Sequence, residues 1–321
     1  CPECCDLSAG EQMWRAVAAA AEGVAAARPG AVVSGLLYHE TLGAAAGAPE
    51  GVEACFAPRE RCRLHPLAGD CARNRPLAAH LREAVEHRGD GLSLLEYYGD
   101  PILLGRPANR VDVVASDLLA CQRAGVRSVS SLVFGVLSWW LYPLQLYGYA
   151  RGSWDPTSVE SAVGEFCRAV AGDAGGEILA RYYRLEGEAA GTHLRFCGYG
   201  QDGSWATLPF PPAAPAGEAR RHLAEMRRGE VLLREASGLL ARLEASGQGG
   251  GHLLDSAVAA HRLEEAFHRA VAARLARGVD GGLPDPLLEA ADAMEAASPG
   301  MRGVFGSYWM LPWLRRGGVE S

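Results

Sequence analysis

Four short apolar segments that alternate with helical segments constrain the fold of the first half of the chain more than any other feature. Residues 31–38, 52–58, 92–98 and 126–135 have the length and composition of strands. Helical patterns surround them at residues 8–28, 77–88, 110–124 and 139–149. This alternation predicts an α/β fold with about four parallel strands. Four strands cannot close a barrel, so we expect either a small open sheet or half of a barrel, and hence a fragment.

The second half of the chain is predicted to be an α-helical domain. Apolar residues recur there at spacings of three and four residues, which is typical of amphipathic helices. We expect helices at residues 157–172, 174–190, 217–245, 252–277 and 284–297. The chain therefore divides into an α/β part, residues 1–152, and a helical part, residues 153–321.

The charge and the hydropathy of the chain argue against a nucleic-acid partner and against a membrane span. The formal net charge of −7 argues against nucleic acid. The stretch between Arg127 and Arg151 has no charged residue and is long enough to cross a membrane. Polar residues and a proline interrupt it, so a buried strand followed by a helix is favoured and no membrane span is expected. The chain begins at Cys1 without a visible signal peptide, and we expect the true N-terminus to be missing, so a cytoplasmic and a secreted location both stay open.

Glu96 is the first candidate for a catalytic residue. It follows an apolar segment, and in barrels of alternating strands and helices the carboxyl ends of the strands carry the chemistry. Tyr97 could pack against a sugar or tune the pKa of Glu96. Tyr38 lies at the end of the first strand and is a second candidate for substrate contact. The alternative for Glu96 is a strand-end carboxylate paired with a nearby arginine.

The loop after the second strand is rich in cationic side chains. Arg59, Arg61, Arg63 and His65 could together hold a carboxylate or sulfate of a sugar, and the alternative is a purely structural loop. We expect Arg59, His65 and Asn74 to contact substrate. Trp139 is a further candidate, as an aromatic platform for a sugar ring or as a packing residue.

Nine cysteines leave at least one thiol unpaired in a monomer. Cys1 and Cys4 have the spacing of metal ligands, and Cys62, His65 and Cys71 could complete a zinc site. A disulfide between Cys62 and Cys71, or free thiols, are the alternatives. The chain has no phosphate-binding loop of the P-loop type, no serine-hydrolase elbow and no zinc-peptidase helix motif.

Several segments, in order, resemble one known family. They are CPECC at the start, LLYHET, RCRLHPLAGDC followed by Asn74, LLEYYGD, SWDP and EFCRAVAG. Over residues 1–190 the chain resembles domain of unknown function 4838, a glycoside-hydrolase-like TIM-barrel family of mostly bacterial proteins. The resemblance implies that the chain is the C-terminal half of a (β/α)8 TIM-like barrel with a helical tail. It also implies that an acid after the fourth strand lies upstream of Cys1. The EYYG at Glu96 resembles the Glu-Tyr-x-Gly of α-glucuronidase barrels, where the glutamate is a base.

Residues and resemblance together predict a carbohydrate-active enzyme of the glycoside hydrolase type. The expected reaction is acid/base hydrolysis of a glycosidic bond with Glu96 as base or nucleophile and without a cofactor. Because the acid is expected upstream, the chain alone is expected to be inactive. The alternatives are a non-catalytic carbohydrate-binding or scaffold protein on a degenerate barrel, and a zinc-stabilised structural module. The sugar, the linkage and the oligomeric state stay open.

Overall fold

A computed structural model describes residues 4–99, 109–133, 143–193, 216–247 and 251–280. The chain forms two compact units. The first comprises residues 1–98, 113–132 and 152–157, and the second comprises residues 99–112, 133–151 and 158–321. The boundary between an α/β domain and a helical domain near residue 152 stays a prediction.

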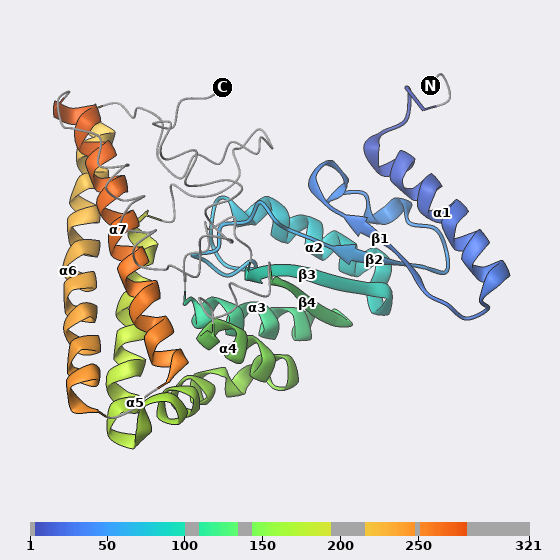
Figure 1. The fold of residues 1–321 in the computed structure, drawn as a ribbon. Coiled ribbons are helices and arrows are strands. Elements are labelled where there is room, and N and C mark those ends of the chain that lie inside the picture. Colours follow the sequence, from blue (N-terminus) through green and yellow to red (C-terminus); the bar gives the residue numbers. More distant parts are fainter. Residues whose placement is uncertain (1–3, 100–108, 134–142, 194–215, 248–250, 281–321) are drawn as a thin grey trace. The chain divides into compact units, whose positions relative to one another are not determined.

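The first unit contains a parallel sheet of four strands in the order β1-β2-β3-β4 (Figure 1). The strands are β1 (Val33–Leu37), β2 (Val52–Phe56), β3 (Leu92–Gly99) and β4 (Ser128–Val133). All four predicted strands are therefore present, and the α/β class is confirmed. Whether this sheet is half of a TIM-like barrel stays a prediction.

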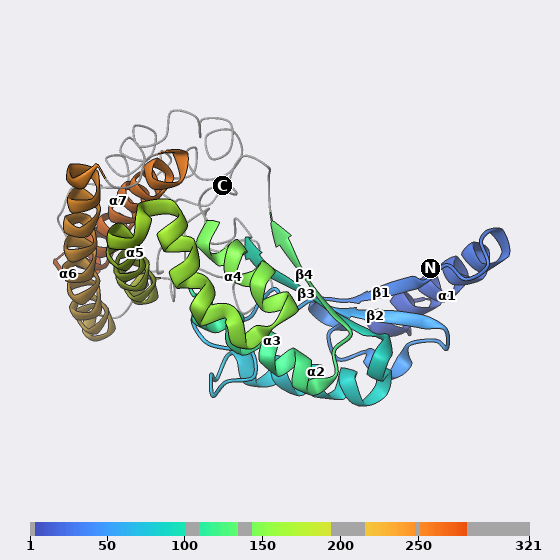
Figure 2. The ribbon, with the colours of Figure 1, turned by 90° about the horizontal axis from the view of Figure 1, so that it is seen from below.

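Helices cover one face of the sheet. They are α1 (Ala9–Ala27), α2 (Asn74–Arg88) and α3 (Val111–Ala124), and Figure 2 shows α2 and α3 on one side of the strands. The register places Leu37 beside Phe56, and Phe56 beside Leu94. These three side chains are fully buried in the core that the strands form with the helices. A capping box begins α1, since Ser8 and Glu11 exchange hydrogen bonds.

The opposite face of the sheet is only partly covered. Side chains alternate along a strand, so Leu36, Cys55 and Leu95 point away from the helical layer. None of the three is buried, and Leu36 is 41% exposed. Parallel sheets are usually buried on both faces. We refer to this side, which is the interior side in a closed barrel, as the open face.

Trp14 of α1 packs directly on β1 at Gly35. The indole is 4% exposed, and its Nε1 donates a 2.7 Å hydrogen bond to the carbonyl of Ala44. A Cβ atom at Gly35 would lie 2.2 Å from Cζ3 of this ring. The strand therefore has room only for glycine at this position.

We expect Gly35→Ala to lower the free energy of unfolding by about 1–3 kcal/mol, because the indole must move out of a packed position. Gly23→Ala on α1 is the matched control, since a Cβ there meets no atom within 4 Å. The control should be neutral or stabilising by up to about 1 kcal/mol through helix propensity. Urea unfolding of both variants tests this, and equal effects would contradict the close packing of Trp14 on β1.

The second unit is helical in the part that the structure describes. It contains most of α4 (Pro143–Trp154) and α5 (Val159–His193), together with α6 (Ala216–Ser246) and α7 (His252–Asp280). Figure 1 shows α5, α6 and α7 packed side by side. Gly172 has a φ of 71° and kinks α5, close to the predicted break between two helices. The helix predicted at residues 284–297 lies outside the described residues.

The uncharged stretch between Arg127 and Arg151 contains β4 and the greater part of α4. Residues 134–142, between them, lie outside the described residues. Within the described ranges, no helix combines the length and the apolar character that crossing a membrane requires.

Candidate functional site

The candidate site lies where β1, β2 and β3 end. Because the three strands are parallel, their carboxyl ends meet at one edge of the sheet. Tyr38 follows β1 directly, the cationic loop at residues 57–73 follows β2, and Glu96 and Tyr97 belong to the end of β3. From this loop, Arg59 contacts Tyr38 and Tyr97, and Arg61 contacts Glu96.

Tyr38, Arg59 and Tyr97 are in contact at this edge. Nη1 of Arg59 donates a 2.9 Å hydrogen bond to the hydroxyl of Tyr38. The guanidinium carbon of Arg59 lies 5.7 Å from the centre of the Tyr97 ring, and that of Arg63 lies 5.6 Å from it. Arg63 also donates a hydrogen bond to the carbonyl of Tyr97. Three residues predicted to bind substrate are thus brought together.

Because side chains alternate along a strand, Tyr38 and Tyr97 lie on the side of the open face, and Arg59 contacts them there. Tyr38 is two residues after Leu36, and Tyr97 is two residues after Leu95. Tyr97 is nevertheless 5% exposed, whereas Tyr38 and Arg59 are half-buried. Solvent therefore reaches this group mainly at Tyr38 and Arg59.

Glu96 points the other way, toward the helical layer. Nη1 of Arg61 lies 2.5 Å from Oε1 of Glu96 and 2.6 Å from Oδ2 of Asp117, a residue of α3. The exposed fractions of the three residues are 4% for Arg61, 1% for Glu96 and 1% for Asp117. Glu96 is therefore a strand-end carboxylate paired with a nearby arginine, which is the alternative that its sequence position left open. Its role as a base stays a prediction, although its carboxylate is enclosed.

One guanidinium serves two buried carboxylates in this triad. Burial raises the pKa of Asp117 to about 6, Arg61 opposes this shift, and Glu96 adds to it. Burial disfavours the charge of Arg61, but Glu96 and Asp117 outweigh this effect and raise its pKa. The pKa of Tyr98 is raised by burial and then by the two carboxylates, and its hydroxyl lies 3.4 Å from Oδ2 of Asp117. The triad thus has one cation for two acids.

Asn74, at the start of α2, organises the loop from inside. Its Oδ1 accepts a 2.7 Å hydrogen bond from the backbone N–H of Cys62. Its Nδ2 lies 3.0, 3.1 and 3.0 Å from the carbonyls of Cys62, His65 and Pro66. Asn74 is 0% exposed. The structure therefore places it within the loop, where it shapes the backbone, and not at a surface that a substrate could reach.

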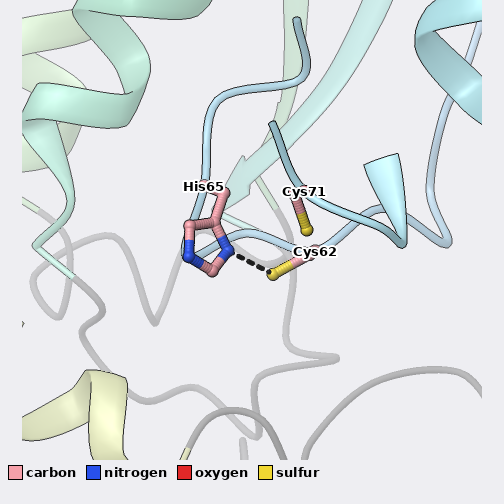
Figure 3. A group of neighbouring side chains, drawn as sticks. All are labelled: Cys62, His65 and Cys71. Atoms are coloured by element: carbon pink, nitrogen blue, oxygen red, sulfur yellow. Dashed lines mark hydrogen bonds between the residues drawn. The ribbon is translucent and has the colours of Figure 1, made fainter. Parts of the chain in front are cut away.

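Cys62, His65 and Cys71 form a compact group on the same loop (Figure 3). Sγ of Cys62 lies 3.3 Å from Nδ1 of His65, and the three candidate ligand atoms lie within 4.8 Å of one another. Both cysteines are free thiols. Burial, and then the Cys71 thiol, raise the pKa of Cys62. Among the described residues no fourth ligand joins the group, so it does not include Cys4.

Two further predicted residues lie outside the described part of the chain. They are Trp139, the predicted aromatic platform, and Cys1, the first of the predicted zinc ligands. Of the five residues predicted to form a zinc site, the structure brings Cys62, His65 and Cys71 together. His65 is exposed, so it remains accessible as a predicted substrate contact.

Sequence reasoning missed a contact between a histidine and a carboxylate at the same edge. Nδ1 of His39 contacts Oε1 of Glu60, and their side chains are 25% and 22% exposed. His39 has a φ of 50°, a left-handed conformation that is uncommon for residues other than glycine. The polar cluster HET directly after a strand was the available signal, but the partner from the next loop could not be inferred from it.

The second unit contains a separate buried polar group. Glu186 and Glu264 are both 0% exposed. Asn109 donates a hydrogen bond to Oε2 of Glu186, and the hydroxyl of Tyr182 lies 3.4 Å from Oε1. Burial, followed by the charge of Glu264, raises the pKa of Glu186 well above its ordinary value. These residues were not among the candidates predicted from the sequence.

Comparison with known proteins identifies no relative. No protein-family model matches the chain, and no curated protein or solved structure is significantly similar to it. The resemblance to domain of unknown function 4838 therefore stays a prediction that rests on the quoted motifs.

Proposed function

We propose that the carboxyl edge of the sheet binds a carbohydrate that carries a carboxylate or sulfate group. The observation that carries this proposal is the contact of Tyr38, Arg59 and Tyr97 on the side of the open face. Aromatic rings pack against the apolar faces of sugars, and the half-buried ring of Tyr38 is the accessible one here, since Tyr97 is buried. A guanidinium binds planar anionic groups through paired hydrogen bonds. The combination of half-buried Arg59 and Tyr38 thus suits an acidic sugar better than a neutral one.

We further propose that binding, and not hydrolysis by Glu96, is the primary activity of this edge. A base or nucleophile must reach the anomeric carbon or its attacking water. The carboxylate of Glu96 instead contacts Arg61 within the helix-covered core. Glu96 then fixes the loop that carries Arg59, which makes it a positioning residue.

Binding to acidic and neutral oligosaccharides of the same backbone tests the proposal. Isothermal titration calorimetry with glucuronate-bearing or sulfated oligosaccharides should show binding that their neutral counterparts lack. Arg59→Met should weaken this binding at least about tenfold, since a charge-assisted hydrogen bond contributes about 1.5–3 kcal/mol. Arg75→Met, at an exposed position of α2, is the matched control. Equal binding by Arg59→Met and the control, or no binding of any acidic glycan, would refute the proposal.

Glycoside hydrolysis is the second candidate, and the His39–Glu60 pair favours it. Glu60 places a half-buried carboxylate at the same edge, next to a histidine that packs on Tyr38. Hydrolysis needs two carboxyl groups, of which Glu60 would be one. Turnover of aryl glycosides by the unchanged chain would support this candidate if Glu60→Gln lowered it about 100-fold or more while the fold was retained. If Glu96→Gln alone abolished turnover in a folded chain, the catalytic carboxylate would be Glu96 instead.

A further inference from the structure

We propose that Cys62, His65 and Cys71 bind a zinc ion on the loop between β2 and α2. The three side chains come from one short segment and point into the same space (Figure 3). This site is independent of the proposed carbohydrate binding, because it uses neither Tyr38 nor Arg59.

The spacing of the ligand atoms is close to that of a bound zinc. Tetrahedral coordination at about 2.3 Å to sulfur and about 2.0 Å to nitrogen separates the ligand atoms by roughly 3.5–3.8 Å. Sγ of Cys62 lies 3.3 Å from Nδ1 of His65, and all three candidate atoms lie within 4.8 Å of one another. Side-chain movements of about one ångström therefore suffice to complete the geometry.

The backbone of the loop is fixed independently of the three ligands. Asn74 accepts a hydrogen bond from the N–H of Cys62 and donates to the carbonyls of Cys62 and His65. Nη2 of Arg61 donates a 2.9 Å hydrogen bond to the carbonyl of His65. Cys71 precedes α2, and its carbonyl accepts a 2.9 Å hydrogen bond from the N–H of Arg75 in the first turn of that helix. Such outer contacts hold metal ligands in place and strengthen binding.

The donor set selects the ion. Two thiolates and one imidazole suit zinc, and calcium and magnesium prefer oxygen ligands. Among the described residues no fourth side chain belongs to the group. His65 is exposed and the two cysteines are half-buried, so water can complete the coordination. The ion would thus have three protein ligands and one exchangeable position.

Metal analysis of the chain purified under reducing conditions tests the site. We expect close to one zinc per chain, and cobalt added to the zinc-free protein should give the absorption bands of thiolate coordination. Cys62→Ser, His65→Ala and Cys71→Ser should each weaken zinc binding at least about 100-fold, beyond the range of an outer-contact change. Cys55→Ser removes a half-buried thiol on β2 outside the group and is the matched control.

Three results would overturn the proposal. The first is protein without zinc that also gives no cobalt–thiolate bands. The second is a metal content that Cys62→Ser and Cys55→Ser lower equally. The third is a Cys62–Cys71 disulfide that, once reduced, leaves a chain unable to take up zinc. Copper in place of zinc would overturn the assignment of the ion.

Discussion

Arg61→Met should lower the free energy of unfolding by about 3–5 kcal/mol. The substitution leaves Glu96 and Asp117 buried beside each other without their shared cation. Removing one partner of a buried ion pair costs this much because an uncompensated charge remains in a medium of low dielectric constant. Urea unfolding near neutral pH, where both carboxyls are expected to ionise once unfolded, measures the loss.

The exposed pair of Arg75 and Asp70 provides the control for Arg61. Its side chains are 70% and 93% exposed, so Arg75→Met should change the stability by less than about 1 kcal/mol. Combining Arg61→Met with Glu96→Gln and Asp117→Asn should recover part of the loss, because no charge is then buried. If Arg61→Met were no more destabilising than Arg75→Met, the triad would not be the electrostatic centre of the first unit.

Asn74→Ala should be the second most damaging change, with a loss of about 2–4 kcal/mol. Four backbone groups of the loop then lose their contact with the amide, and each buried group left unsatisfied costs about 1–3 kcal/mol unless water reaches it. Hydrogen exchange gives a local readout, since the amide of Cys62 should lose its protection.

Arg82→Ala is the control for Asn74, because Arg82 is exposed on the same helix and should change the stability by about 0.5 kcal/mol or less. Asn74→Ala should also weaken zinc binding about 10–100-fold, since the backbone that carries Cys62 and His65 loses its support. Unchanged exchange at Cys62 together with unchanged stability would contradict the organising role of Asn74.

The sequence predicted the strands well because their apolar runs are bounded by turns and separated by amphipathic helices. It could not predict which way Glu96 points. In the segment LSLLEYY both faces carry a leucine, so the pattern does not distinguish the helix-covered face from the open face. The register with Leu37 and Phe56 decides the matter, and register is a property of pairing that one strand alone does not reveal.

Asp117 shows a signal that sequence reasoning could have used. It falls four residues after Val113 and directly before Leu118, within the apolar stripe of α3. A carboxylate at such a position requires a partner, and the arginine-rich loop is the obvious source. The identity of that partner still depends on the fold, since Arg61 is 56 residues away in the chain.

The buried carboxyl groups also make folding a proton-binding reaction. Burial raises the pKa of Asp117 from 3.8, the ordinary value for an aspartate, to about 6, and it raises the pKa of Glu186 as well. At Asp117 the folded state therefore binds more protons than the unfolded state between about pH 4 and pH 6, so unfolding there releases protons from this group. The stability that Asp117 contributes is lost as the pH rises through about 6, and below that pH the folded protein is less negative than formal counting of its residues suggests.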